Sequence, residues 1–278
     1  MPSDLHTHTI FSDGTYSPEE LVAMAKGVGI VYFAITDHDT VDGVKYLYEN
    51  GIYPDKGIKI IPGVEFSANN AEHDIHIVGY NIDIYNGALS DMVNEISEAR
   101  WTRFSEMIKN LQDNNYNIRE ADVLQVAGSS HSIGRFHIAR TLVKKGEFKT
   151  VREAFEEMLG KDKPAYAPRY FPEVEEIVEV IHQAGGQAAL AHPKLIEDDS
   201  LVESICPKVD GIEVFYPNHQ SEDIQRYLGF AEKFNLFPIG GSDFHGSASR
   251  FVKELGDFTI EDDIAKKIYD LNSDNQQQ

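Results

Sequence analysis

Cysteine is nearly absent from this chain of 278 residues, in which Cys206 is the single example. One cysteine cannot form an intramolecular disulfide framework, and a thiolate metal site needs several sulfur ligands. The sequence therefore excludes a disulfide-rich domain and a zinc-finger type of site. Because Cys206 lies in an apolar segment, we expect it to be buried and unreactive.

Long hydrophobic runs are also missing. The longest clean apolar run covers residues 30–35, far short of the roughly 20 residues that a membrane-spanning helix needs. The first residues, Met1 to Asp4, contain neither a basic cluster nor an apolar signal core, and histidines with functional spacing begin at position 6. We therefore expect a cytoplasmic protein without a leader and without membrane association.

Positive charge is scarce, with 25 Lys and Arg residues against 46 Asp and Glu residues and a formal net charge of −21. This balance argues against a protein that wraps long nucleic acid with a basic surface. It leaves room for a small anionic ligand in a locally positive pocket. The 41% hydrophobic content is that of a globular protein, and nothing in the sequence requires an obligate protein partner.

Short apolar segments rich in β-branched residues alternate with helical patterns, which indicates an α/β fold with a mostly parallel sheet. Helix starts are recognisable at Ser17-Pro18, at Thr150 with Glu153 three residues later, and at Pro172. We predict seven strands, at 4–8, 31–36, 59–65, 74–80, 187–191, 211–215 and 237–241.

The alternation stops between residues 89 and 169. Three helical patterns follow one another there, at 89–114, 133–145 and 151–159, with no parallel strand between them. We therefore predict a barrel domain made of 1–88 and 170–278, and a helical insertion at 89–169. Barrels of this kind vary their loops at the C-terminal face, where such a cap would cover the site. The polar tail, 272–278, is predicted to fray.

Histidines and carboxylates gather where the predicted strands end. In a strand, His6 and His8 occupy alternate positions and point to the same side. The carboxyl ends of parallel strands share one concave face, where the active sites of barrel enzymes lie. Neutral imidazoles and carboxylates are ligands for zinc, manganese or iron, and the lack of thiolates fits a catalytic site. The set comprises His6, His8, Asp13, His38, Glu65, His76, His192, Asp243 and His245.

These residues stand in motifs that resemble the PHP (polymerase and histidinol phosphatase) superfamily. The motifs are Asp4-Leu-His-Thr-His8, Thr36-Asp-His-Asp39, Pro62-Gly-Val-Glu65, Ala191-His-Pro193 and Gly241-Ser-Asp-Phe-His245, and the resemblance extends from Met1 to about Gly246. It is greatest to the stand-alone branch of phosphoesterases that act on nucleoside phosphates and short RNA ends. The resemblance implies a distorted (β/α)7, TIM-like barrel, in agreement with the seven predicted strands.

The resemblance also implies up to three divalent ions. It gives one ion to His6, His8, Glu65 and Asp243, a second to Glu65, His76 and His192, and a third to Asp13, His38 and His245. An aspartate at position 13, where some relatives have histidine, shifts the preference toward harder ions such as Mn²⁺, with Zn²⁺ and Fe²⁺ as the other candidates. Three ions and three carboxylates leave a charge of about +3, which suits a phosphate group.

Three further carboxylates lie beside these motifs. Asp37 and Asp39 either orient neighbouring imidazoles or form a turn or a helix cap. We expect Glu213, inside the sixth predicted strand, to support a ligand or fill the barrel rather than to bind metal.

The helical insertion contains a second motif of the same branch, Gly134-Arg-Phe-His-Ile-Ala-Arg140, with Phe136 where a proline is expected. Arg135 suits bidentate phosphate contact. The alternative interpretation is that Arg135 is a solvated residue at the start of a helix. We expect substrate contacts from Arg135, His137, Arg140, Lys194 and His219. Asp13, His219 and Arg135 are the candidates for catalysis, with His219 as a proton donor to the leaving group.

The motifs together predict a metal-dependent phosphoesterase that acts on small nucleotides, of the AMP or 3′,5′-bisphosphonucleotide type, or on the 5′ end of short RNA. Divalent ions lower the pKa of bound water to about 7, so hydroxide is the expected nucleophile. Three alternatives stay open: a histidinol-phosphate-type phosphatase, a binuclear amidohydrolase, and a non-enzymatic PHP scaffold with a structural metal site. The third ligand set, Asp13, His38 and His245, favours phosphoryl chemistry over an amidohydrolase.

Overall fold

The computed structural model describes residues 1–70, 73–128, 133–168 and 170–275. The chain divides into two compact units. The sheet unit comprises Met1–Val93 and Phe171–Gln278, and the helical unit comprises Asn94–Tyr170. Residue 169, where the sequence places a domain boundary, lies outside the described part of the chain, and the division at 88 and 169 stays a prediction.

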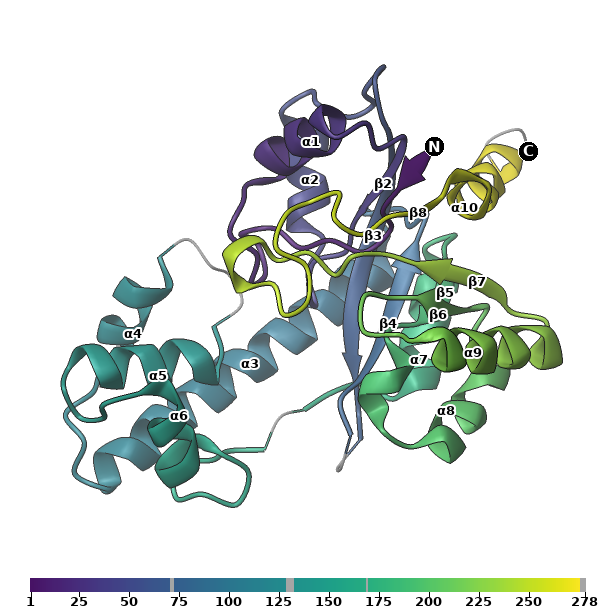
Figure 1. The fold of residues 1–278 in the computed structure, drawn as a ribbon. Helices are drawn as coiled ribbons and strands as arrows, with labels where there is room; N and C mark the ends of the chain where they lie inside the picture. Colours follow the sequence, from purple (N-terminus) through teal and green to yellow (C-terminus); the bar gives the residue numbers. More distant parts are fainter. Residues whose placement is uncertain (71–72, 129–132, 169, 276–278) are drawn as a thin grey trace. The chain divides into compact units, whose positions relative to one another are not determined.

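The sheet unit is built on a curved, six-stranded half-barrel (Figure 1). Its strands lie side by side in sequence order: β2 (Tyr32–Ile35), β3 (Lys59–Ala68), β4 (Ile75–Tyr80), β5 (Gln187–Leu190), β6 (Gly211–Phe215) and β7 (Phe237–Gly240). This mixed α/β architecture is consistent with the expected TIM-like barrel, and each of these strands lies where the sequence predicts one.

The direction of β4 differs from the expectation of a mostly parallel sheet. β4 runs antiparallel to both neighbours, β3 and β5, whereas the other three pairings are parallel. The connection from β3 to β4 covers only residues 69–74, and a parallel pair needs a crossover of a dozen or more residues. The short connection therefore forces an antiparallel pair.

The predicted strand at 4–8 is present as a bridging segment without a continuous ladder. On one side the amide of Asp4 donates to the carbonyl of Tyr32 (3.0 Å), beside β2. On the other side the amide of His8 donates to the carbonyl of Phe244 (3.0 Å), just after β7. The segment therefore joins the first and last strands of the half-barrel.

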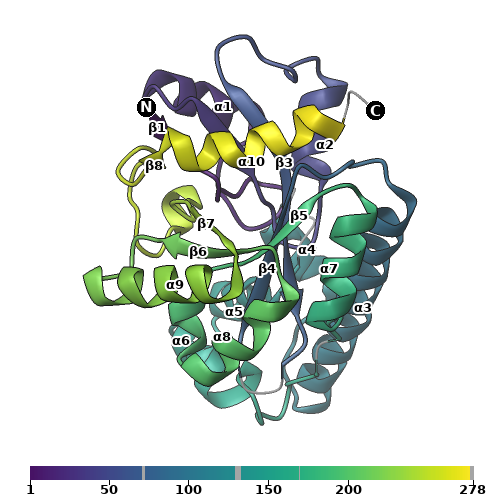
Figure 2. The ribbon, with the colours of Figure 1, turned by 90° about the vertical axis from the view of Figure 1, so that its right-hand side faces the viewer.

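Helices cover the sheet unit on its outer side: α1 (Pro18–Gly27), α2 (Asp42–Glu49), α7 (Val174–Gln183), α8 (Asp199–Ile205), α9 (Ser221–Phe234) and α10 (Asp262–Asn275). Ser17 caps α1 as expected, since its hydroxyl accepts from the amide of Glu20. α7 packs against β4 and β5, α9 against β6, and α10 against β2 (Figure 2). The apolar face of α10 packs on a core that includes Leu5, Ala34, Ile61, Val78, Ala189, Ile239, Ala265 and Ile268.

Shorter elements complete this unit: β1 (Pro2–Ser3) pairs antiparallel with β8 (Ile260–Glu261), and 3₁₀ turns lie at Pro193–Ile196, Cys206–Lys208 and Gly246–Ala248. Cys206 is buried, as expected, and burial raises the pKa of its thiol to about 11. The expectation that the chain frays from residue 272 is wrong as far as Asn275, because α10 continues to that residue.

The helical unit has its own core, lined by Phe104, Leu111, Ile138, Leu142 and Leu159. The long helix α3 (Gly87–Asp113) begins in the sheet unit and continues into this one, where α4 (Glu120–Ala127), α5 (Arg135–Lys144) and α6 (Val151–Ala154) follow. α6 runs on as a π-helical turn, Phe155–Leu159. The sequence patterns predict α3, α5 and α6 but miss α4, which buries only Val123. Among the described residues, no helix is long and apolar enough to span a membrane.

Gly241, just after β7, gives a direct test of how tightly the bridging segment is packed. A Cβ at this position would lie 2.5 Å from the backbone nitrogen of His6, so Gly241→Ala forces the backbones apart. We expect Gly241→Ala to lower the free energy of unfolding by about 3 kcal/mol or more, as measured by urea denaturation.

Gly229 in α9 is the matched control, because a Cβ there meets nothing within 4 Å. Gly229→Ala removes a flexible residue from a helix interior and should raise stability by about 0.5–1 kcal/mol. Equal effects of the two substitutions would contradict the close contact at Gly241.

Candidate metal centre

One edge of the half-barrel collects the histidines and carboxylates singled out in the sequence. His6 and His8 come from the bridging segment, His38 follows β2, and His192 follows β5. Glu65 lies within β3, and Asp243 and His245 follow β7. His76 is the second residue of β4, and it reaches the same edge because β4 is antiparallel: it pairs with Ser67 near the end of β3.

A first group consists of His6, His8, Glu65 and Asp243. Nε2 of His6 and Nε2 of His8 each lie 3.3 Å from Oε2 of Glu65. Nε2 of His8 also lies 3.1 Å from Oδ1 of Asp243, and Nε2 of His6 lies 3.6 Å from the same oxygen. Four ligand atoms therefore face one small volume, and they include carboxylate oxygens from Glu65 in β3 and from Asp243 after β7.

The second carboxylate oxygen of Glu65 faces a different pair of imidazoles. Oε1 lies 2.9 Å from Nδ1 of His76 and 3.0 Å from Nε2 of His192, and these two nitrogens are 3.3 Å apart. Nδ1 of His38 lies 2.9 Å from Oε2, and His38, Glu65 and His76 also form a group with metal-ligand spacing. Glu65 thus lies between two groups of ligands.

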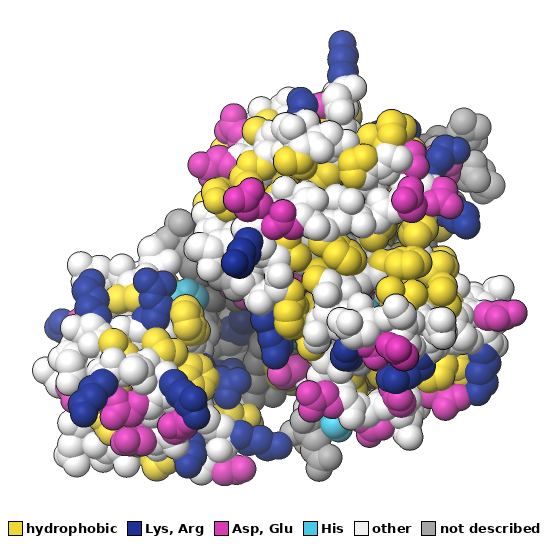
Figure 3. Space-filling view, viewed as in Figure 1, with side chains coloured by type: hydrophobic (Ala, Val, Ile, Leu, Met, Phe, Trp, Pro, Cys, Tyr) yellow, Lys and Arg dark blue, Asp and Glu magenta, His cyan; other side chains and the backbone are white. Residues whose placement is uncertain are grey.

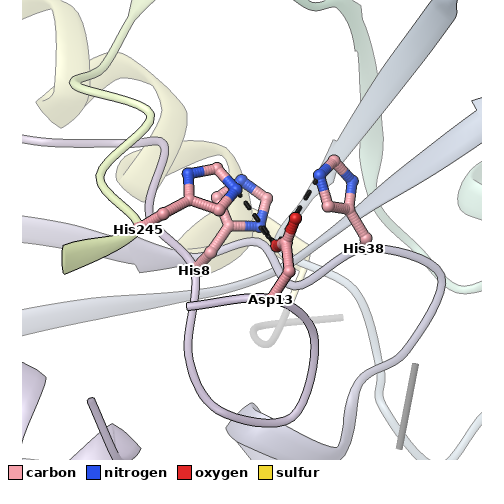
Figure 4. A group of neighbouring side chains, drawn as sticks. All are labelled: His8, Asp13, His38 and His245. Carbon is pink, nitrogen blue, oxygen red and sulfur yellow. Dashed lines mark ion pairs between the residues drawn. The ribbon is translucent and has the colours of Figure 1, made fainter. Parts of the chain in front are cut away.

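A third group surrounds Asp13, as Figure 4 shows. Oδ1 of Asp13 lies 3.1 Å from Nε2 of His245, 3.9 Å from Nε2 of His38 and 4.0 Å from Nδ1 of His8. The rings of His8 and His245 stack at 3.9 Å. The structure therefore adds His8 to the three residues that the resemblance implies here. The Asp13 side chain is 52% exposed, so it is more open to solvent than His76 at 21% or Asp243 at 17%.

Several ligand atoms are buried without a hydrogen-bond partner among the described residues. They are Nε2 of His6, both ring nitrogens of His8, Nδ1 of His38, Oε2 of Glu65 and Nδ1 of His192. Buried polar groups are normally satisfied. These atoms approach one another at 2.9–3.3 Å without hydrogen-bond geometry, which is the arrangement expected of groups that converge on cations. The donor set, imidazole and carboxylate without thiolate, also fits divalent ions.

The electrostatics of the cluster indicate the same need for positive charge. Burial opposes ionisation of Glu65, yet His38, His6 and His76 hold its pKa well below the usual range. Burial likewise opposes protonation of His38, yet Glu65 and Asp13 raise its pKa to about 10. Without another cation, the carboxylates therefore favour protonated His6 and His38, and divalent ions would supply that charge instead.

Two buried side chains that hold ligands in place were not assigned a definite role from the sequence. Glu213, fully buried in β6, faces Nδ1 of His6 with Oε1 (3.1 Å) and accepts the amide of His192 with Oε2 (2.7 Å). The hydroxyl of Tyr216 donates to Oδ2 of Asp243 (2.9 Å). Glu213 falls within the expectation of a supporting group, whereas Tyr216 was missed, because only the fold brings it to Asp243.

Asp37 and Asp39 make hydrogen bonds to residues 25–28 positions away in the sequence, which are not the bonds of a turn or a helix cap. Asp37 accepts from the amide and hydroxyl of Thr9 and from the hydroxyl of Ser12, and so shapes the loop that carries Asp13. Asp39 accepts from the amide and hydroxyl of Ser67. These bonds fix loops at the edge of the sheet.

The backbone is strained at two ligands. His192 has a φ of 27° and Asp243 a φ of 53°, in the left-handed region that residues other than glycine rarely adopt. Both residues lie two or three positions after a strand ends, and the hydrogen bonds from the His192 amide to Glu213 and from Tyr216 to Asp243 hold them there.

The other residues expected to contact substrate lie in two places. In the sheet unit, Nδ1 of His219 is hydrogen-bonded to the carbonyl of Val214 (2.8 Å), while its Nε2 is buried without a partner among the described residues. Nζ of Lys194 is paired with Asp223 (2.6 Å), so its charge is already neutralised.

In the helical unit, Arg135 is the first residue of α5 and half-buried. Nδ1 of His137 accepts from the amide of Gly134 (3.2 Å), and so caps the start of α5. Arg140 is exposed, with its guanidinium 5.9 Å from the ring of Phe136. The roles of these residues and of the metal ligands stay predictions.

Comparison with known proteins gives consistent matches. A model of the PHP domain family matches residues 4–184. The chain is 33% identical over 248 residues to the 5′-3′ exoribonuclease Rnm of Salmonella typhimurium, covering 87% of this chain and 84% of that protein. It is 30% identical over 262 residues to the 3′,5′-nucleoside bisphosphate phosphatase of Chromobacterium violaceum, covering 91% of each. The crystal structure of a protein described as a metal-dependent phosphoesterase, from Bifidobacterium adolescentis, matches with a TM-score of 0.81 and 30% identity over 100% of both chains.

Glu213 provides a test of how the ligands are held. Glu213→Gln removes the negative charge beside Nδ1 of His6 and should weaken Mn²⁺ binding by about 10–100-fold, as measured by titration of the metal-free chain. Glu232→Gln, an exposed change on α9, is the control and should leave metal affinity unchanged. Unaltered affinity in Glu213→Gln would show that its contact with His6 does not support metal binding.

The metal-free chain should lose stability as the pH rises. The pKa of His38 is raised from 6.5 to about 10 on folding, so its protonation stabilises the fold fully below pH 6.5. That contribution disappears as the pH passes through about 10. Chemical denaturation in EDTA should therefore give a falling free energy of unfolding from pH 6.5 to 10, with a shallower fall in His38→Gln. A stability that rises over this range would contradict the charge balance described here.

Proposed function

This chain belongs to the PHP domain family and is a metal-dependent phosphoester hydrolase, and we propose that it hydrolyses phosphate esters of small nucleotides or at the 5′ end of short RNA. The observation that carries the proposal is the position of Glu65. Its two oxygens face two sets of imidazoles, and a third set lies around Asp13. Such adjoining ligand groups suit a phosphate whose attacking and leaving oxygens both need stabilisation.

The proposed site holds up to three divalent ions, with Mn²⁺, Zn²⁺ or Fe²⁺ as the candidates. When bound, such ions supply positive charge to the phosphate and make water acidic enough to attack at neutral pH. Their proposed ligands are His6, His8, Asp13, His38, Glu65, His76, His192, Asp243 and His245. Glu65 belongs to two sets, so it fixes the spacing between them.

The side chains of the sheet unit then have separate tasks. Asp13, half exposed, holds the solvent-facing group where a phosphate can enter. Tyr216 and Glu213 keep Asp243, His6 and His192 in position through their hydrogen bonds. His219 is the proposed proton donor to the leaving group, because its Nδ1 bond to Val214 leaves Nε2 available for a proton. Burial lowers the pKa of His219, which makes its protonated form a stronger acid.

Arg135, His137, Arg140 and Lys194 are the proposed contacts to the rest of the substrate. The pairing of Lys194 with Asp223 makes Lys194 the weakest of these, because a phosphate would have to compete with that carboxylate. Arg135 is a stronger candidate than Lys194, since Arg135 has no ion pair among the described residues and its guanidinium can bind phosphate in bidentate fashion.

Nucleotide substrates are favoured over the alternatives by the relatives, which are named as a nucleoside bisphosphate phosphatase and an exoribonuclease. The net charge of −21 argues against long nucleic acid. Histidinol phosphate stays the second candidate, and a purely structural metal site is disfavoured because all nine ligand positions are filled. We keep the cytoplasm as the predicted compartment, and predict no obligate protein partner.

The test is phosphate release by metal-loaded protein. The substrates are AMP, adenosine 3′,5′-bisphosphate, histidinol phosphate and a short 5′-phosphorylated RNA, with metal counted on the same sample. We expect turnover of a nucleotide or of the RNA, falling about 100-fold or more in Asp13→Ala. Asp91→Ala, an exposed change on α3, is the control and should retain full activity.

Three other outcomes would each contradict a different part of the proposal. Turnover of histidinol phosphate alone would establish the second candidate. Bound metal without turnover of any member would favour a scaffold or an unrelated substrate. Full activity in Asp13→Ala would remove the third ligand group from the reaction.

A further inference from the structure

The sheet unit carries little positive charge. It contains 12 Lys and Arg residues against 35 Asp and Glu residues, and Figure 3 shows acidic and hydrophobic side chains together on one face of it. Its two arginines are Arg226 and Arg250. Arg226 pairs with Asp199, whereas Arg250 is exposed and has no ion pair among the described residues. Arg250 therefore remains available to an anionic ligand.

The residue after Arg250 is an exposed aromatic one. Phe251 is 37% exposed, and the guanidinium carbon of Arg250 lies 5.0 Å from the centre of its ring. Single exposed hydrophobic residues are common on protein surfaces, so exposure alone gives Phe251 no role. The neighbours of its ring are what connect it to the metal centre.

Tyr216 lies between Phe251 and the candidate metal ligands. The rings of Phe251 and Tyr216 are 5.7 Å apart between their centres, with an angle of 80° between their planes. Tyr216 is buried, its ring lies 5.6 Å from that of His192, and its hydroxyl donates to Oδ2 of Asp243 (2.9 Å). Phe251 is thus separated from two proposed ligands by a single ring, so its exposed part lies at the edge of the candidate metal centre.

The loop that carries these two residues is fixed on both sides. Before it, the hydroxyl of Ser249 accepts from the amide of His245 (2.6 Å), and His245 belongs to the ligand group around Asp13. After it, Val252 is buried. Phe251 is therefore held in a defined position beside the ligands, which lowers the entropy cost of binding a second ring against it.

An exposed aromatic ring beside an arginine suits a nucleobase. Bases stack on aromatic side chains because every base has a π-face, and arginine guanidinium groups stack on bases as well. Phenylalanine has no hydrogen-bonding group with which to recognise the edge of a base, so it does not distinguish one base from another. Such a surface fits a substrate whose phosphate binds at the metal centre and whose base lies beside it.

We propose that Phe251 and Arg250 form the surface on which the base of the nucleotide substrate stacks. The proposal rests on the proposed function in taking the substrate to be a nucleotide. It makes the loop after β7 select nucleotides over phosphate esters that have no base, with tolerance of all four bases.

A nucleoside tests stacking without turnover, because it has no phosphate ester to hydrolyse. The probe is 2-aminopurine riboside, whose fluorescence is quenched when its base stacks on another ring, and it is titrated with the Zn²⁺-loaded full chain. We expect saturable quenching by the wild type. Phe251→Leu keeps an apolar side chain but lacks the ring, and should weaken binding by about tenfold. Phe251→Trp restores a ring and should bind at least as tightly as the wild type.

Tyr85→Leu is the matched control for these variants. Tyr85 is also an exposed aromatic residue of the sheet unit, but it follows β4 at the end away from His76. Its substitution should leave the affinity for the nucleoside unchanged.

Thermal unfolding checks that each variant is folded. Arg250→Gln changes an exposed side chain, should weaken binding by about threefold, and decides the matter if Phe251→Leu fails to fold. A wild type that does not quench the nucleoside, or a folded Phe251→Leu variant that binds it as tightly as the wild type, would overturn the proposal.

Kinetics of the metal-loaded enzyme separate this proposal from the proposed function. AMP and ribose 5-phosphate carry the same ester and differ in the base, so the ratio of their kcat/KM values measures the contribution of the base. This ratio should fall by about tenfold in Phe251→Leu and stay unchanged in Tyr85→Leu.

Two outcomes distinguish the failure of one proposal from the failure of the other. If the enzyme turns over nothing but quenching depends on Phe251, the proposed function is wrong and the stacking surface stands. If nucleotides are turned over and neither the ratio nor the quenching changes in Phe251→Leu, the stacking surface is wrong and the proposed function stands.

Discussion

The burial of the Glu65 carboxylate is the constraint on which the metal centre depends. A fully buried negative charge is costly unless positive charge surrounds it, and here five histidines lie within about 3.3 Å of its two oxygens. They come from the bridging segment, from the loop after β2, from β4 and from the loop after β5. Because every one of them must reach the same carboxylate, Glu65 sets the positions of segments that are distant in the sequence.

Hydrogen bonds from neighbouring side chains hold this arrangement in place, although the backbone is strained at two of the residues that they hold. Glu213 and Tyr216 fix His6, His192 and Asp243, and two of these have left-handed backbone angles. Asp37 fixes the loop before Asp13 in the same manner. The half-barrel edge is therefore rigid where the ligands are buried, while Asp13 remains open to solvent.

Sequence patterns predict the six strands of the sheet and the nine clustered side chains because both depend on local rules: β-branched runs form strands, and polar residues at strand ends meet at one edge. The direction of β4 depends instead on the length of the 69–74 connection, which overrides the parallel pattern. The role of His76 is implied by the family resemblance, and His76 reaches the site only because β4 is reversed. Tyr216 escapes sequence reasoning, because its hydrogen bond to Asp243 depends on a contact between distant elements.

The bridging segment at 4–8 has a consequence for the order in which the protein assembles. Asp4 accepts hydrogen bonds from the amide and hydroxyl of Ser242, 238 residues further along the chain, and His6 and His8 meet Asp243 beside it. Contacts of such high sequence separation form slowly, because loop closure must precede them. During synthesis His6 and His8 therefore cannot make these contacts until Asp243 has been added to the chain. A chain that has been synthesised only as far as residue 242 lacks Asp243 and His245, so it cannot hold the complete ligand set.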